Sequence, residues 1–159
     1  MFLALWLTVF IVLTATFGYF QGDEVSTVSV SSTDASNSLR IKANRRHHYI
    51  FDGKINGKAV RFMVDTGASS VAVPSNLARQ LALTKLYPVN VNTANGRTKG
   101  HLSRLKSIEL GNIRLSNVGA VIMPRSEEPP VVLLGMSALK RLEIKQDKGY
   151  LIMIQRQAQ

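Results

Sequence analysis

The chain contains no cysteine and only three histidines among its 159 residues. Without cysteine it can form no disulfide, no thiolate metal site and no cysteine nucleophile. The histidines, His47, His48 and His101, make no metal-ligand spacing with an acidic partner. We therefore expect neither a metal ion nor another cofactor.

Lysine and arginine are absent from residues 1–39, where Asp23, Glu24 and Asp34 are the charged residues. All 20 basic residues and seven acidic ones lie in residues 40–159, which gives this part a formal charge of +13. Such a charge favours anionic partners. The basic residues are scattered singly and are not interleaved with aromatic residues, so nucleic-acid binding is not expected.

The first 20 residues contain no charged side chain and are about long enough to cross a bilayer as a helix. A cleaved signal peptide is the alternative, but no basic segment precedes the apolar run and no small-residue cleavage site closes it. The sequence therefore favours an uncleaved, single-pass N-terminal transmembrane anchor. Because no Lys or Arg occurs before Arg40, we expect the downstream domain to be extracytoplasmic.

Residues 21–44 are rich in serine, threonine, asparagine and aspartate and poor in large apolar side chains. Such a composition buries too little surface to offset the entropy lost on ordering. The sequence thus predicts a flexible polar linker over residues 21–44 and a folded domain over residues 45–159.

The domain shows short strand-like runs separated by turn signals. Asn56-Gly57 lies between two alternating runs and predicts a hairpin, since both residue types tolerate positive φ. Gly111-Asn112 and Lys148-Gly149 are typical of further tight turns. The expected strands are residues 48–55, 58–64, 87–93, 102–110, 113–123, 131–134 and 150–154.

Two short helices complete the expected elements. One covers residues 77–83 with Ser75 or Asn76 as its cap, and the other covers residues 136–142. The fold class is therefore mainly β, and these elements predict a small closed barrel with two short helices.

One acidic residue, Asp65, directly follows an apolar strand and precedes the small residues Thr66, Gly67 and Ala68. This placement predicts a carboxyl group at a strand end in a partly buried cleft. An ordinary turn is the alternative, with the Asp65 carboxylate accepting from nearby backbone N–H groups.

Three segments resemble the retropepsin-like (retroviral-type) aspartic proteases. Val64-Asp65-Thr66-Gly67-Ala68-Ser69 is similar to their active-site loop, and Thr93-Ala94-Asn95-Gly96 to the flap tip of the bacterial members. Val132-Leu133-Leu134-Gly135 resembles the segment that passes behind that loop. The apolar N-terminus is similar to the bacterial single-span members, which implies an inner-membrane location.

The resemblance implies a role for each matching residue. Asp65 would be the catalytic acid, Thr66 would hydrogen-bond across a twofold axis, and Gly67 and Ala68 would support the loop. Residues Thr93, Ala94, Asn95 and Gly96 would close over a bound peptide, although an Asn-Gly hairpin turn explains them equally well. Leu133, Leu134 and Gly135 would be structural.

A single Asp-Thr-Gly implies that the protein acts as a homodimer on a polypeptide substrate. Peptide hydrolysis by water needs a base and an acid, which two carboxyl groups that share a proton can supply. The other acids of the domain lie beside charged residues, prolines or turns, so a second chain must contribute the second Asp65. A non-catalytic module that binds peptides or anionic surfaces remains the alternative.

Overall fold

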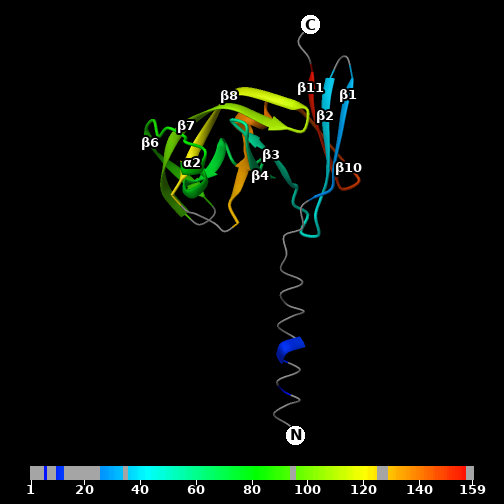
Figure 1. The fold of residues 1–159 in the computed structure, drawn as a ribbon, viewed down its shortest axis with the longest axis horizontal. Coiled ribbons are helices and arrows are strands. Elements are labelled where there is room, and N and C mark those ends of the chain that lie inside the picture. Colours follow the sequence, from blue (N-terminus) through cyan, green and yellow to red (C-terminus); the bar gives the residue numbers. More distant parts are fainter. Residues whose placement is uncertain are drawn as a thin grey trace.

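The computed structural model describes residue 6 and residues 10–12, 26–33, 36–93, 96–124 and 129–156. Two sheets dominate it, and Figure 1 shows them side by side. The larger sheet contains seven strands in the order β3-β4-β9-β5-β8-β7-β6. Its strands are β3 (Ile50–Ile55), β4 (Lys58–Val64), β5 (Val71–Pro74), β6 (Pro88–Thr93), β7 (Gly96–Leu110), β8 (Ile113–Met123) and β9 (Val131–Leu134).

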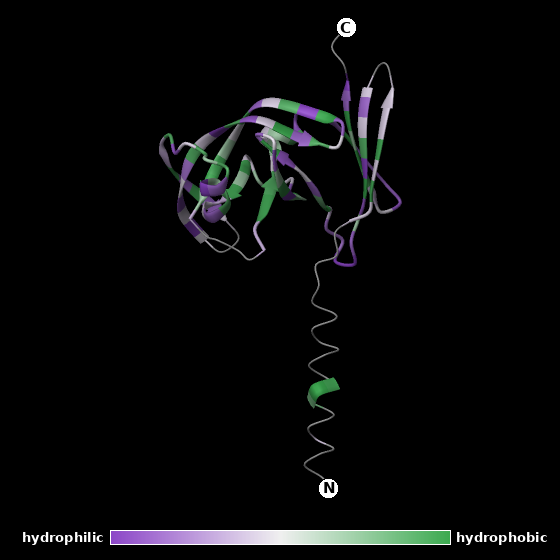
Figure 2. Ribbon diagram, viewed as in Figure 1, coloured by the Kyte–Doolittle hydropathy of each residue, from purple (hydrophilic) through white to green (hydrophobic). Residues whose placement is uncertain are grey.

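This sheet closes on itself, because β3 also pairs with β7 through Lys54–Glu109 and Ile55–Ile108. Strand β6 stands outside the ring and pairs only with β7 in the strand order. The predicted mainly β fold with a small closed barrel is thereby confirmed. Figure 2 shows hydrophilic and hydrophobic residues alternating along β7 and β8, as expected for strands with one buried face.

Tight turns set the register of the barrel hairpins. Asn56 and Gly57 have φ values of 51° and 81° and join β3 to β4, while Gly111 at 59° joins β7 to β8. Two consecutive residues with positive φ match the twist of the flanking strands. Inside the barrel, the Phe51 and Phe62 rings stack with centroids 5.9 Å apart, and both side chains are fully buried.

The second sheet is built from both ends of the described domain, in the order β1-β2-β11-β10. Its strands are β1 (Val28–Thr33), β2 (Ser36–Lys42), β10 (Glu143–Asp147) and β11 (Tyr150–Arg156). We call it the terminal sheet. Across β10 and β11, the hydrogen bond from Arg156 and the neighbouring Lys145 hold the pKa of the Glu143 carboxyl below its usual value.

The terminal sheet corrects the predicted linker over residues 21–44. Residues 28–33 and 36–42 form strands, and Leu39 and Ile41 on β2 are 0% exposed within the hydrophobic core. The composition argument failed because these two apolar side chains, two positions apart on one strand face, are enough to dock β2 against β11.

Both helices are shorter than predicted. Helix α2 covers Ser75–Gln80 and α3 covers Met136–Leu139. Pro74 occupies the N-cap position of α2, and no side chain makes a capping hydrogen bond there, so the predicted cap at Ser75 or Asn76 is wrong. Helix α3 begins directly after Gly135, which brings it against the loop that follows β4.

The predicted transmembrane anchor also requires correction. Among the described residues, no helix is long and apolar enough to cross a bilayer, which overturns the anchor and the inner-membrane location inferred from it. A membrane-spanning helix needs about 20 consecutive apolar residues. Of residues 1–20 the structure describes Trp6 and residues 10–12; the rest of the predicted segment lies outside the described residues.

Candidate active site

Asp65 lies immediately after β4, where the parallel strands β4 and β9 end together. Val64 pairs with Leu134, and the next backbone N–H, that of Asp65, donates to the Leu134 carbonyl at 3.2 Å. The Asp65 side chain is half-buried, whereas Thr66 and Gly67 are exposed. The backbone of Asp65 is therefore fixed to the barrel, while its carboxyl group is partly accessible to solvent.

The loop after β4 folds back on the Asp65 carboxyl group. The Gly67 N–H donates to Asp65 Oδ1 at 2.9 Å, and the Ala68 N–H donates to the Asp65 carbonyl at 3.3 Å. These are the bonds that an ordinary aspartate turn would make, so an ordinary turn and an active-site loop share the same geometry here.

The segment behind the loop is packed tightly against it. The Met136 N–H donates to the Ala68 carbonyl at 2.8 Å, and the Ser137 N–H donates to the Ser69 carbonyl at 3.0 Å. A Cβ atom placed on Gly135 would collide with the backbone carbonyl oxygens of Ser70 and Ala68. Only a residue without a side chain lets the two backbones approach this closely.

Ser137 adds a side-chain link that sequence reasoning missed. Its Oγ donates to the Gly119 carbonyl on β8 at 2.7 Å and accepts from the Val71 N–H on β5 at 3.0 Å. One hydroxyl thus ties α3 to two barrel strands beside the loop. The sequence feature that could have indicated this link is the position of Ser137, two residues after Gly135 at the start of the predicted helix.

A cavity of about 650 Å³ opens in front of Asp65. The Asp65 loop forms one wall and residues 89–93 of β6 form another. Strands β7, β8 and β9 contribute Leu102, Val121, Met123 and Leu133. Among the described residues that line it, Asp65 is the one ionisable group. The apolar lining had no signal in the sequence, because strands remote in sequence meet there.

The structure brings several predicted site residues to this cavity: Asp65, Gly67, Ala68, Thr93 and Leu133 all line it. Leu134 is instead fully buried in the core, and Gly135 lies behind the loop.

The described residues of the predicted flap, Thr93 and Gly96, lie where β6 ends and β7 begins. Thr93 pairs with Gly96, and the Thr93 hydroxyl donates to the Gly96 carbonyl at 2.8 Å. Gly96 has φ of 101°, a conformation that favours glycine. Ala94 and Asn95, the other two residues of the predicted flap tip, lie outside the described residues.

The arrangement offers carboxylate chemistry. Among the described residues, no group of three histidine, aspartate or glutamate side chains could hold a metal ion. A closed barrel lobe that presents one Asp-Thr-Gly loop, with a Leu-Gly segment braced behind it, defines the class of the retropepsin-like aspartic proteases. Comparison with known proteins supports this class, and the chain belongs to the family described as gag-polyprotein putative aspartyl protease, whose family model matches residues 51–141.

The chain is similar to two curated bacterial proteins, both described as uncharacterized. The chain is 29% identical over 120 residues to a protein from the cobV 5′ region of a Sinorhizobium species, and the match covers 74% of this chain and 51% of the relative. It is 33% identical over 126 residues to a protein of Rickettsia prowazekii (strain Madrid E), with 77% and 53% covered. The chain therefore spans about half the length of the curated relatives it matches.

A solved structure has a similar fold over most of its length. The crystal structure of a retropepsin-like aspartic protease from Rickettsia conorii superposes with a TM-score of 0.64 at 28% identity. The similarity covers 82% of this chain and 96% of the other. It extends beyond the 91 residues of the family match and so includes more than the barrel strands around Asp65.

Proposed function

We propose that the protein is an aspartic endopeptidase that hydrolyses peptide bonds with a water molecule activated between two Asp65 carboxyl groups of a homodimer. The observation that carries this proposal is the Asp65 carboxyl group at the wall of a 650 Å³ cavity with no other ionisable group among its described lining residues. The Asp65 carboxyl group can act on a peptide bond held in this cavity, while the apolar walls accept peptide side chains.

The chemistry requires two carboxyl groups in contact. One removes a proton from the attacking water while the other donates a proton to the peptide carbonyl oxygen, and a proton then passes to the leaving amine. Two carboxyl groups this close cannot both ionise, so they share a proton and one is always available as the acid. Their titration belongs to the pair and not to either residue.

The other described carboxylates are poor candidates for the second group. Asp52 pairs with Arg61 at 3.1 Å, Glu109 with Arg114 at 3.6 Å, and Glu143 with Arg156 and Lys145. Asp147 is exposed at the β10–β11 turn. A second copy of the chain supplies an identical Asp65 through a twofold axis without any further residue.

The remaining site residues take the roles that the family resemblance suggests. Thr66, exposed beside Asp65, would hydrogen-bond to its counterpart in the second chain, and Gly67 and Ala68 would keep the loop close to the substrate. Thr93 and Gly96, with Ala94 and Asn95 between them, would close over the peptide. Leu133, Leu134 and Gly135 would hold the loop from behind.

Replacement of Asp65 by asparagine tests the proposal. The amide side chain would keep the acceptor oxygen for the Gly67 N–H but could act neither as acid nor as base, so we expect cleavage of a diverse peptide library to fall at least about 1,000-fold. Mass spectrometry identifies the cuts, and thermal unfolding checks that the fold is retained. The Asp147→Asn variant, which changes an exposed acid away from the cavity, should cleave like the wild type.

Two results would reject the proposal. Wild-type protein that binds peptides but cuts none would indicate a binding module. Equal cutting by the wild type and by Asp65→Asn would indicate a different catalytic residue.

A further inference from the structure

Strand β7 continues past the cavity and carries basic side chains on the same face. Leu102, Arg104 and Lys106 are exposed, while the alternate residues Ser103, Leu105 and Ser107 are buried. Residues two apart on a strand point to the same side, so these three form one row. Leu102 lines the Asp65 cavity, and the row therefore leads away from that cavity.

Two guanidinium groups converge on Asn117, opposite this row on β8. Arg104 Nη1 donates to Asn117 Oδ1 at 2.9 Å. Arg141, which follows α3, donates to the Ser116 carbonyl at 2.6 Å and to the Asn117 carbonyl at 3.0 Å. Asn117 has φ of 56° and lies where the pairing passes from Leu105–Val118 to Ser107–Ser116. We call Arg104, Lys106 and Arg141 the Asn117 basic cluster.

The positive charge of this cluster is not neutralised within the described part of the chain. The described acids Asp52, Glu109 and Glu143 form their ion pairs with other basic residues, and no described carboxylate pairs with the cluster. Holding two guanidinium groups near one residue costs Coulomb energy unless an anion offsets it. The hydrogen bonds of Arg104 and Arg141 to Asn117 and Ser116 hold the two guanidinium groups in place to bind such an anion.

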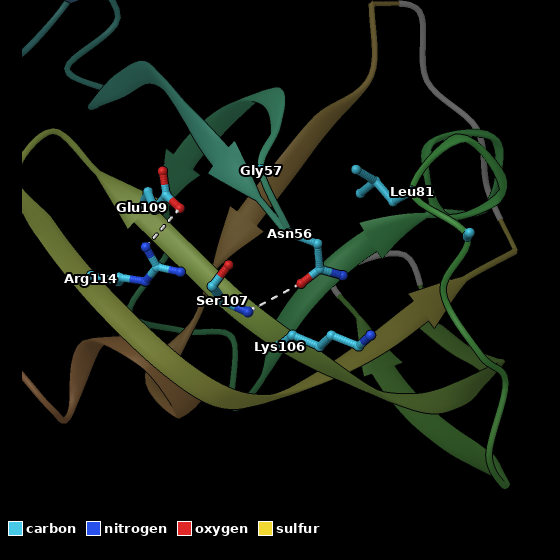
Figure 3. A pocket seen from close by; sticks show the side chains of 8 residues that line it. Asn56, Gly57, Leu81, Lys106, Ser107, Glu109 and Arg114 are labelled. Atoms are coloured by element: carbon cyan, nitrogen blue, oxygen red, sulfur yellow. Dashed lines mark hydrogen bonds and ion pairs between the residues drawn. The ribbon is translucent and has the colours of Figure 1, made fainter.

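A hollow of about 390 Å³ lies at the cluster, lined by Thr84, Leu86, Arg104, Lys106, Ser116 and Asn117. A second hollow also includes Lys106, but its other cation, Arg114, already pairs with Glu109 (Figure 3). In that view the Lys106 side chain points away from the Glu109–Arg114 pair. The first hollow is therefore the better anion site.

The cluster is continuous with the Asp65 cavity through the chain that precedes β6. The Leu86 N–H donates to the Leu102 carbonyl, and the Leu102 N–H donates to the Tyr87 carbonyl, both at 2.8 Å. Leu86 and Tyr87 are 48% and 69% exposed. Thus Leu86 lines the hollow while its hydrogen-bonded partner Leu102 lines the cavity.

We infer that the Asn117 basic cluster binds acidic side chains of the polypeptide that occupies the Asp65 cavity. This inference rests on the proposed endopeptidase function and gives it a substrate class: peptides with Asp or Glu a few residues from the cleaved bond. Arg104 and Lys106 lie about 7 and 13 Å along β7 from Leu102, at roughly 3.3 Å per residue. An extended peptide would therefore bring acids two to four residues beyond its Leu102 contact to the cluster. Guanidinium groups pair well with carboxylates.

The test compares two peptides that share a sequence cut by the wild type and differ in their flanks. One carries Glu two and four residues from the cleaved bond on either side, and the other carries Gln there. We expect a KM about three- to tenfold lower for the acidic peptide, because a few exposed ion pairs contribute modestly. The ratio of the two KM values should approach one as salt is raised from about 0.05 to about 0.5 M.

Charge reversal locates the effect. Arg104→Glu combined with Lys106→Glu should abolish or invert the ratio of KM values. Lys42→Glu combined with Lys148→Glu changes the net charge equally on the terminal sheet and should keep the ratio. Equal KM values for both peptides, or an equal loss in both double variants, would overturn the inference.

A binding measurement separates this inference from the proposed function. Fluorescence anisotropy of the labelled acidic peptide with Asp65→Asn protein should give a Kd lower than that of the neutral peptide, and the advantage should vanish on adding the Arg104→Glu and Lys106→Glu changes. Selective binding without any wild-type cleavage would reject the protease function alone. Cleavage without selective binding or selective KM would reject the basic cluster as a substrate site.

Discussion

At the scale of single residues, the candidate site depends on what lies behind Asp65 as much as on Asp65 itself. A side chain at position 135 would collide with the carbonyl oxygens of Ser70 and Ala68, so these backbones can approach closely only because residue 135 is glycine. The loop is therefore positioned by contact between two backbones, and its geometry is sensitive to a single methyl group.

Gly135→Ala should destabilise the protein by roughly 1–3 kcal/mol or more, because the new Cβ forces the loop away from α3. Gly119→Ala is the matched control, since a Cβ there meets nothing within 4 Å. Thermal unfolding should show a melting temperature several degrees lower for the first variant and close to wild type for the second. Similar melting temperatures for both would mean that the loop and α3 are not in close contact.

At the scale of elements, the sequence predicted those strands whose turns carry a distinctive residue. Positive φ occurs at one or both positions of Asn56-Gly57, Gly111-Asn112 and Lys148-Gly149, and all three turns were expected. Both flanking strands were predicted at the first two turns, but only the following strand at the third. Strands β1 and β2 were missed because their Ser-rich composition resembles a linker. Strand β10 was missed because it is largely polar. Strand β5 was also missed, although β9, which is equally short, was predicted.

The candidate site, like the strands, could be predicted from the sequence only in part. The Asp65 loop and the segment at Gly135 have local sequence signals, and both lie where expected relative to each other. The sequence carries no local signal for Leu102, Val121 and Met123, because the pairing order of the barrel strands alone brings them to the cavity. The roles of the loop and flap residues stay predictions.

The docking of β2 can be tested by shortening one side chain. Leu39→Ala should lower the free energy of unfolding by about 2–5 kcal/mol, the usual cost of removing a buried leucine side chain. Val28→Ala on the neighbouring β1 is the control, because Val28 is partly exposed and should change stability by less than about 1 kcal/mol. Urea titrations measure both. A negligible effect of Leu39→Ala would show that residues 36–42 are a linker after all.

At the scale of the whole molecule, two requirements oppose one another. The proposed chemistry needs two chains in contact at Asp65, while residues 40–159 of each chain carry a formal charge of +13. Like-charged domains repel over a distance set by ionic strength, about 10 Å at 0.1 M salt. Association should therefore be weakest in dilute buffer.

Specific activity on a neutral peptide should fall on dilution and, well below the dimer midpoint, the rate should follow the square of protein concentration. Raising salt from about 0.02 to about 0.15 M should shift the midpoint to lower concentration, because screening weakens the repulsion. Sedimentation of the same samples reports the fraction of dimer. A rate proportional to concentration, from protein that sediments as a monomer, would require a second catalytic group within one chain.

The terminal sheet also governs the order in which the chain can fold. Leu39 pairs with Met153 and Arg40 with Ile152, so β2 finds one of its two partner strands at the opposite end of the described chain. Such distant pairing is slow because a long loop must close first, whereas β3 and β4 can pair through their two-residue turn early. A nascent chain still lacking β11 would leave one edge of β2 unpaired, and an unpaired strand edge favours misassembly with other chains. Synthesis of β11 is thus the step that closes this edge.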